Sequence, residues 1–135
     1  LFPNWERSIF CAAACNAGKQ VGTCFHRDCR NLAFGFCVVH AVGKYNCRRG
    51  GHIVLKEPKL IIQFPSGSHV LLPSATITHG NIPVQDSETR ASFTQYTAGA
   101  MFRYVDNDFG TEKQLKRKSK AKYRQMVEEK ATRWE

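Results

Sequence analysis

The sequence lacks the signals of a membrane protein and those of the common nucleotide-binding motifs. No apolar run approaches the ~20 residues that a membrane-spanning helix needs. Leu1–Phe10 has no apolar stretch of the signal-peptide type. Nothing resembles a P-loop, a nucleophile elbow or a dinucleotide fingerprint. These absences argue against those classes, and they predict an intracellular, cytoplasmic protein with no membrane partner.

Acidic residues are also few. Eleven Asp and Glu stand against twenty Lys and Arg, which gives a formal net charge of +9. A length of 135 residues with 42% hydrophobic and 23% charged residues is typical of one folded domain and excludes a disordered chain. The positive charge favours a polyanionic partner, and we expect RNA, with no protein partner indicated.

The six cysteines include no CxxC pair, so a zinc ribbon is not expected. Cys11 and Cys15 lie four residues apart in an apolar stretch, and on a strand their Cα atoms would be ~13 Å apart, too far for a disulfide. Six cysteines allow fifteen pairings, among which the sequence does not choose. We expect buried free thiols in a reducing compartment.

Residues 1–110 show the pattern of an all-β core. Short apolar runs are separated by Gly, Pro and Asn at steady spacing, which predicts a double-stranded β-helix of the jelly-roll, cupin-like kind. The predicted strands are Ile9–Ala14, Val21–His26, Leu32–Val42, His52–Leu55, Leu60–Phe64, Val70–Leu72, Thr76–His79, Ala91–Tyr96 and Met101–Tyr104.

Residues 111–135 form a second segment of different character. Thr111 is a suitable N-cap, Glu112 suits the positive end of a helix, and no Gly or Pro follows. Seven basic residues and no acidic one lie between Lys113 and Arg124. We therefore predict one basic α-helix, packed on the core by its apolar side chains and able to contact phosphates with the others.

One group of residues, His26, Asp28 and His79, predicts a metal site. His26 and Asp28 alternate on a predicted strand, so their side chains can face one cavity, and His79 follows on a distant strand. Two histidines and one carboxylate form a metal-binding face that leaves positions for water or substrate, and this face accepts Fe(II), Zn, Mn or Mg. Arg90 starts the next strand, where its guanidinium can bind a carboxylate.

Several blocks of the chain resemble the C-terminal part of a large mushroom family of dioxygenases. This family is related to the ten-eleven-translocation and base-J-binding-protein enzymes, which oxidise nucleobases with Fe(II) and 2-oxoglutarate. The resemblance implies that His26, Asp28 and His79 are metal ligands and that Arg90 anchors 2-oxoglutarate. The matching blocks are Ser8–Ala13, Phe25–Gly35, Gly50–Leu55, Phe64–Gly67, Leu72–Asn81, Glu88–Gly99, Phe102–Val105 and Arg133–Trp134.

The family places a long region before the strand that begins here at Ser8, and we expect the cleft wall that it builds to be missing. An open site suits attack by metal-bound water better than an oxidation that must be shielded from water. The chain is also similar in length and charge to the ribotoxin-like proteins of mushrooms, which are small, basic, metal-dependent ribonucleases that cleave ribosomal RNA.

Three interpretations follow, in this order of preference. The first is a metal-dependent ribonuclease, in which His40 or His52 is the general acid or base and Arg90 stabilises developing charge. The second is a dioxygenase, in which Fe(II) takes the same ligands and a base is flipped into the pocket. The third is a barrel that only binds RNA. In each, the predicted nucleic-acid contacts are Lys44, Arg48, Arg49, Lys113, Lys116, Arg117 and Lys120.

Overall fold

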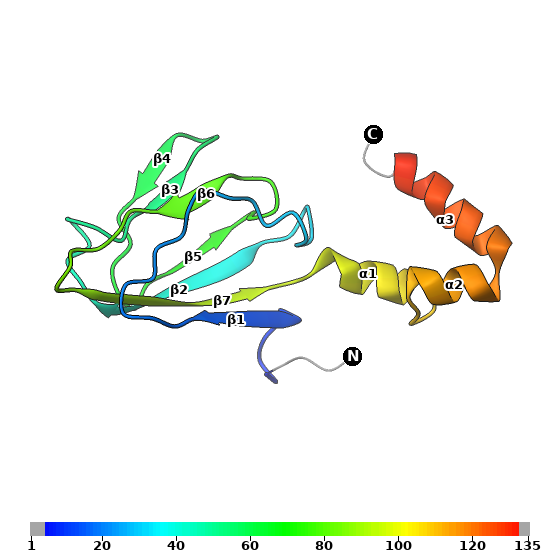
Figure 1. The fold of residues 1–135 in the computed structure, drawn as a ribbon, viewed down its shortest axis with the longest axis horizontal. Coiled ribbons are helices and arrows are strands. Elements are labelled where there is room, and N and C mark those ends of the chain that lie inside the picture. Colours follow the sequence, from blue (N-terminus) through cyan, green and yellow to red (C-terminus); the bar gives the residue numbers. More distant parts are fainter. Residues whose placement is uncertain (1–4, 133–135) are drawn as a thin grey trace. The chain divides into compact units, whose positions relative to one another are not determined.

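Seven strands and three helices are present in the part of the chain that the computed structural model describes, residues 5–132. They form two compact units, Leu1–Gly99 and Ala100–Glu135. The elements, shown in Figure 1, are β1 (Ala12–Asn16), β2 (Cys37–Lys44), β3 (Ile53–Leu55), β4 (Leu60–Ile62), β5 (His69–Leu72), β6 (His79–Asn81), β7 (Thr89–Tyr96), α1 (Gly99–Asp106), α2 (Glu112–Lys118) and α3 (Lys120–Thr132).

The first sheet is antiparallel and has the strand order β1-β7-β2-β5. Its longest pairing joins β2 to β7, with Gly43 opposite Arg90. Gly43 has φ 140°, and a Cβ atom there would lie 2.2 Å from the carbonyl oxygen of Thr89. A side chain at this position would therefore push the two strands apart next to Arg90.

The second sheet is antiparallel with the order β4-β3-β6. An isolated bridge pairs His26 with His79, so the segment before His26 lies along the free edge of β6. The backbone N–H of Asn81 also donates to the Thr23 carbonyl at 3.1 Å. A Cβ atom on Gly80 would lie 3.0 Å from that same carbonyl oxygen, which explains the glycine between His79 and Asn81.

Side chains alternate between the two faces of each strand, and those on one face point to the interior of the β unit. The core cluster consists of Ala41, Ile53, Leu55 and Phe64, each at most 7% exposed. Full burial of such an aliphatic or aromatic side chain contributes about 1.5–3 kcal/mol to folding. On the long strand β7 the residues facing the same interior are polar, and they line a cavity rather than a packed core.

Most predicted strands are present with ends that lie at most five residues from the expected ones, but two are not. Val21–His26 forms bridges rather than a named strand. Met101–Tyr104, predicted as a strand, lies inside helix α1. A four-residue apolar run is too short to separate the helical period from the strand period, and the Ala, Met and Arg around it favour a helix.

The helical unit begins earlier than predicted, after Gly99 rather than after Gly110. Thr111 is the N-cap of α2, and its capping box with Gln114 confirms the predicted helix start. The predicted single helix is wrong, because Ser119 adopts an extended conformation and separates α2 from α3. The block Arg133–Trp134, which resembles the dioxygenase family, lies outside the described residues. No described helix combines the length and apolar character needed to cross a bilayer.

Candidate metal centre

The three predicted ligands lie together. Reciprocal backbone hydrogen bonds of 3.0 and 2.9 Å join His26 and His79, which holds their Cα atoms on adjacent strands. Their ring centroids are 4.4 Å apart. Asp28 Oδ1 lies 3.4 Å from His26 Nε2, and one candidate ligand atom from each of the three residues lies within 4.8 Å of the others. Small side-chain rotations would bring all three to the ~2.1 Å that one ion requires.

Backbone carbonyls set the tautomers of both histidines. His26 Nδ1 lies 2.9 Å from the carbonyl oxygen of Cys24, and His79 Nδ1 lies 3.0 Å from that of Ile77. A carbonyl oxygen only accepts, so each Nδ1 must carry the proton. Each Nε2 is then left with its lone pair, which is the form that ligates a metal.

The Asp28 carboxylate is oriented by the half-buried Asn31 and the buried Ser74. Asn31 Nδ2 donates to Asp28 Oδ2 at 3.2 Å and to Ser74 Oγ at 3.1 Å. The Asp28 N–H also donates to the Ser74 carbonyl at 2.8 Å, and Ser74 is 1% exposed. These contacts occupy Oδ2 and leave Oδ1 facing His26.

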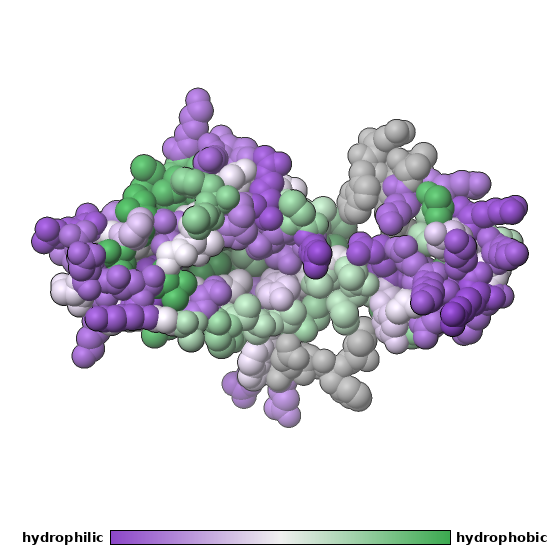
Figure 2. Space-filling model, viewed as in Figure 1, coloured by the Kyte–Doolittle hydropathy of each residue, from purple (hydrophilic) through white to green (hydrophobic). Residues whose placement is uncertain are grey.

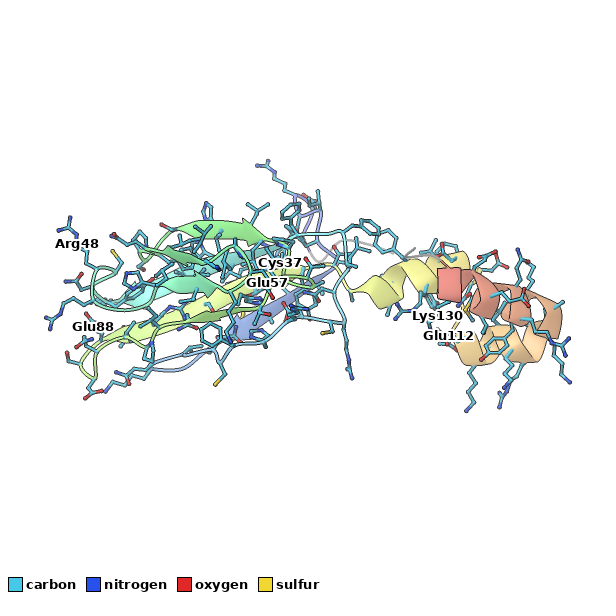
Figure 3. All side chains as sticks on the ribbon, turned by 90° about the horizontal axis from the view of Figure 1, so that it is seen from above. Cys37, Arg48, Glu57, Glu88, Glu112 and Lys130 are labelled. Atoms are coloured by element: carbon cyan, nitrogen blue, oxygen red, sulfur yellow. The ribbon has the colours of Figure 1, made fainter. Side chains whose placement is uncertain are left out.

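A second network holds the ligand-bearing segments from outside. Glu57 accepts hydrogen bonds from the Thr78 N–H, from Thr78 Oγ1 and from Arg27 Nη2, at 2.7, 2.7 and 2.5 Å. The bonds from Thr78 and Arg27 lower the pKa of Glu57 to about 2. Arg27 lies between His26 and Asp28, and Thr78 precedes His79. Glu57 thus joins the two segments that carry the ligands; Figure 3 labels it.

The ligands line a cavity of about 630 Å³, which also contains Arg90. Arg90 is 3% exposed, and its Nη1 donates to the Val21 carbonyl at 2.9 Å. Its Nε is buried and has no hydrogen-bond partner, and no acidic residue among those described pairs with it. Burial lowers the pKa of Arg90, while the adjacent Tyr45 raises it.

Sequence reasoning missed Cys37, Asn31, Ser74 and Glu57. Cys37 is 2% exposed and lines the cavity, and burial raises the pKa of its thiol. Asn31 and Ser74 lie in two of the blocks that resemble the dioxygenase family, Phe25–Gly35 and Leu72–Asn81, but the sequence of these blocks does not show that the two side chains contact each other. The alternation of Cys37 with Val39, both of which line the cavity, is the one signal that the sequence offered.

Other predicted residues lie elsewhere. His40 alternates with the cavity-lining Val39, and its Nδ1 lies 3.0 Å from His69 Nδ1, so it faces away from the cavity. His52 does not line the cavity either, which removes both predicted general acid–base residues from the site. Lys44, the last residue of β2, and the loop residues Arg48 and Arg49 are exposed and do not line it. Figure 3 shows Arg48 at one end of the β unit.

The sequence predicted buried free thiols, and of the five cysteines Cys15, Cys24, Cys29, Cys37 and Cys47 only Cys37 is both free and buried. All five are free, but Cys15, Cys24 and Cys29 are exposed rather than buried. The predicted basic residues Lys113, Lys116, Arg117 and Lys120 belong to the helical unit.

No protein-family model matches this chain, and no curated protein matches it. The chemistry of the centre is therefore inferred from its donor set. Two neutral imidazoles and one carboxylate suit Fe(II), Zn and Mn, and they leave open coordination positions for substrate. The residues fit a metal ion, and the buried Arg90 guanidinium, whose Nε has no hydrogen-bond partner, fits a carboxylate or phosphate in the same cavity.

Proposed function

We propose that the β unit is an Fe(II)- and 2-oxoglutarate-dependent dioxygenase that oxidises a nucleobase. One observation carries the proposal: the buried guanidinium of Arg90, with an unpartnered Nε, shares a cavity with the His26, Asp28 and His79 side chains. A buried cation without a counterion is destabilising. A bidentate carboxylate is the ligand that best satisfies a guanidinium, and 2-oxoglutarate offers one.

The strand order supports a double-stranded β-helix as the fold. When the bridge at His26 counts as an edge strand, each sheet has four strands, and the chain repeatedly crosses between the sheets. β1, β2, β5 and β7 belong to one sheet, and β3, β4, β6 and the His26 edge belong to the other. The alternation of the chain between two antiparallel sheets supports this proposal, because a jelly roll requires such crossings.

In the proposed mechanism, His26, Asp28 and His79 would hold the iron through their imidazole nitrogens and carboxylate oxygen. With O₂ and 2-oxoglutarate, the iron supplies hydroxylation of a C–H bond, with release of succinate and CO₂. Arg90 binds and orients the co-substrate carboxylate. Asn31 keeps the Asp28 carboxylate turned toward the histidines.

The substrate side of the cavity is open. The side chains of His26 and Asp28 are 40% and 32% exposed, so a base extruded from a strand can reach them. Thr23, Asn81 and Thr94 also line the cavity and offer hydrogen-bond donors and acceptors for a base edge. Val39 and Ile53 add apolar walls to the cavity.

A metal-dependent ribonuclease is the second candidate, favoured by that same exposure. In this mechanism His26, Asp28 and His79 would hold a Zn, Mg or Mn ion, which would supply Lewis-acid chemistry at a phosphate, and Arg90 would stabilise developing charge. It ranks second because His40 and His52 lie outside the cavity, so neither predicted general acid–base residue reaches the reacting atoms. Binding of RNA without catalysis is the third candidate.

The test is succinate release by the full chain with Fe(II), O₂ and 2-oxoglutarate, measured with DNA and RNA oligonucleotides whose bases are then analysed by mass spectrometry. We expect succinate and an oxidised base. The Arg90→Leu variant should bind 2-oxoglutarate at least ~100-fold more weakly, because the bidentate pair is lost. Arg7→Leu, a change of an exposed arginine, is the matched control.

Two results would contradict the proposal. The first is cleavage of ribosomal RNA with Mg or Zn and no iron, oxygen or 2-oxoglutarate, which would establish the ribonuclease. The second is RNA binding by a protein that neither cleaves RNA nor consumes 2-oxoglutarate, which would leave the non-enzymatic candidate.

A further inference from the structure

The loop between α1 and α2 holds two residues in a strained backbone conformation. Asp108 and Phe109 have φ values of 55° and 57°, in the left-handed region that side chains other than glycine rarely adopt. For a bulky residue such as phenylalanine this conformation is a true outlier, and such outliers cluster at functional sites. The Phe109 side chain is also 61% exposed, so burial of the ring does not compensate for the strain.

The ring of Phe109 borders a hollow of about 260 Å³ within the helical unit. Gln114, Arg117 and Lys118 of α2 line the same hollow. Tyr104 meets Phe109 edge to face at a centroid distance of 6.1 Å, which supports the ring from one side. The one acidic group of the hollow, Asp108, lies 3.4 Å from Lys122 Nζ and is neutralised by it.

We propose that Phe109 is a stacking platform for an unpaired base of a single-stranded nucleic acid, with Arg117 and Lys118 contacting the adjacent phosphates. This deepens the proposed function, since it rests on a nucleic-acid substrate for the β unit. It adds a binding residue that the basic pattern of the helices does not reveal.

The chemistry of the hollow selects this class of ligand. An exposed aromatic ring next to cationic side chains is the arrangement that binds single strands, because every base offers a π-face and every nucleotide a phosphate. Bases of a duplex are already stacked on their neighbours and offer no free face. Arg117 and Lys118 lie in a stretch without acidic residues, Lys113–Arg124, which favours a polyanion over an acidic protein patch.

The experiment compares Phe109→Gly with Phe109→Trp, measuring anisotropy of a labelled ten-nucleotide oligouridine and of the same strand in a duplex. Phe109→Gly relieves the strain at positive φ, so its melting temperature should stay equal or rise. Its affinity for the single strand should fall about 10-fold or more, because stacking is lost. Phe109→Trp should retain or increase that affinity. Phe36→Ala, a change of a 54% exposed ring in the β unit, is the control.

Unchanged single-strand affinity in Phe109→Gly would overturn the inference, as would equal losses for the single strand and the duplex, or a loss in Phe109→Trp as large as in Phe109→Gly. These measurements need neither iron nor 2-oxoglutarate. A failure of the proposed oxygenase therefore shows in the succinate assay alone, and a failure of the stacking site shows in the binding assay alone.

Discussion

The β unit and the helical unit contain equal numbers of basic side chains but place them in different environments. Each contains ten of the twenty Lys and Arg residues. In the β unit, Arg90 is buried in a cavity and Arg27 is fixed by Glu57. In the helical unit, Lys116, Arg117 and Lys120 are exposed to solvent, as the hydrophilic surface in Figure 2 shows for the helices.

This difference teaches which interactions carry specificity. A buried guanidinium acts at fixed geometry in a low dielectric, so it selects one ligand shape and is little screened by salt. Exposed cations act through the summed field, so they attract polyanions of many shapes and are strongly screened. Under the proposed function, the β unit would select the reacting group and the helical unit would hold the polymer.

The largest effect should come from a substitution in the cavity of the β unit. His79→Ala removes one of three metal ligands and should lower metal affinity more than ~100-fold, since even the loss of an outer hydrogen bond lowers it 10–100-fold. Calorimetric titration with Fe(II) under anaerobic conditions, or with Mn, measures this. His69→Ala, a change on the face away from the cavity, is the control.

His79 is 9% exposed, so its loss also affects packing. His26→Ala, at a 40% exposed side chain, tests the same ligand set with less disturbance of the core. Full metal affinity in a folded His26→Ala protein would show that the three residues do not act as one centre.

A smaller effect should come from substitutions of the exposed basic residues in the helical unit. Reversing Lys116, Arg117 and Lys120 to Glu should weaken RNA binding about 10–100-fold and reduce the salt slope of the affinity, because fewer counterions are released. Reversing Lys44, Arg48 and Arg49 to Glu changes the net charge equally, and it should weaken binding less. Fluorescence anisotropy across a salt titration measures both variants, and equal losses would erase the distinction between the units.

The smallest effect concerns Glu57. Glu57→Ala should lower metal affinity about 10-fold, because the segments that carry the ligands lose a shared anchor. Glu88→Ala is the matched control: bonds from the backbone of Gln85 and Asn46 lower the pKa of Glu88 too, but it lies away from the ligands, at the other end of the β unit in Figure 3. Equal metal affinity in the two folded variants would refute the anchoring role.

Glu57 also predicts a pH dependence of stability. Its pKa is lowered from 4.5 to about 2 in the folded protein, so the folded state favours the ionised form. The stabilisation is present above pH 4.5 and is lost as the pH falls toward 2. Thermal melts between pH 2 and 6 should therefore show wild type and Glu57→Ala converging at the acidic end.

The sequence predicted that His26, Asp28 and His79 lie close together, and the structure brings them within reach of one another. The spacing of His26 and Asp28 fixes a shared face on any extended segment, and the apolar runs locate most strands. Arg90 was found by its place at the start of a strand, and the structure adds that its guanidinium is buried.

What the sequence missed depends on contacts between distant segments. Glu57 lies in a turn and becomes part of the centre only because Arg27 and Thr78 meet it in space. The sequence offered His40 as an acid–base residue, but the register of β2 places it opposite His69 and away from the cavity. Ser119 breaks the helix although no Gly or Pro marks the position, and the strand at Met101–Tyr104 failed because the run is too short to show a period.

The backbone pairing of His26 with His79 has a consequence for the order of folding. These residues are joined across a long stretch of chain, and loops of this kind close late, after local turns and hairpins have formed. An unfolded or half-synthesised chain therefore offers an ion only the neighbouring imidazole and carboxylate of His26 and Asp28. If the proposed centre binds an ion, its third ligand would arrive when β6 docks, and tight retention of the ion would report that the second sheet has been completed.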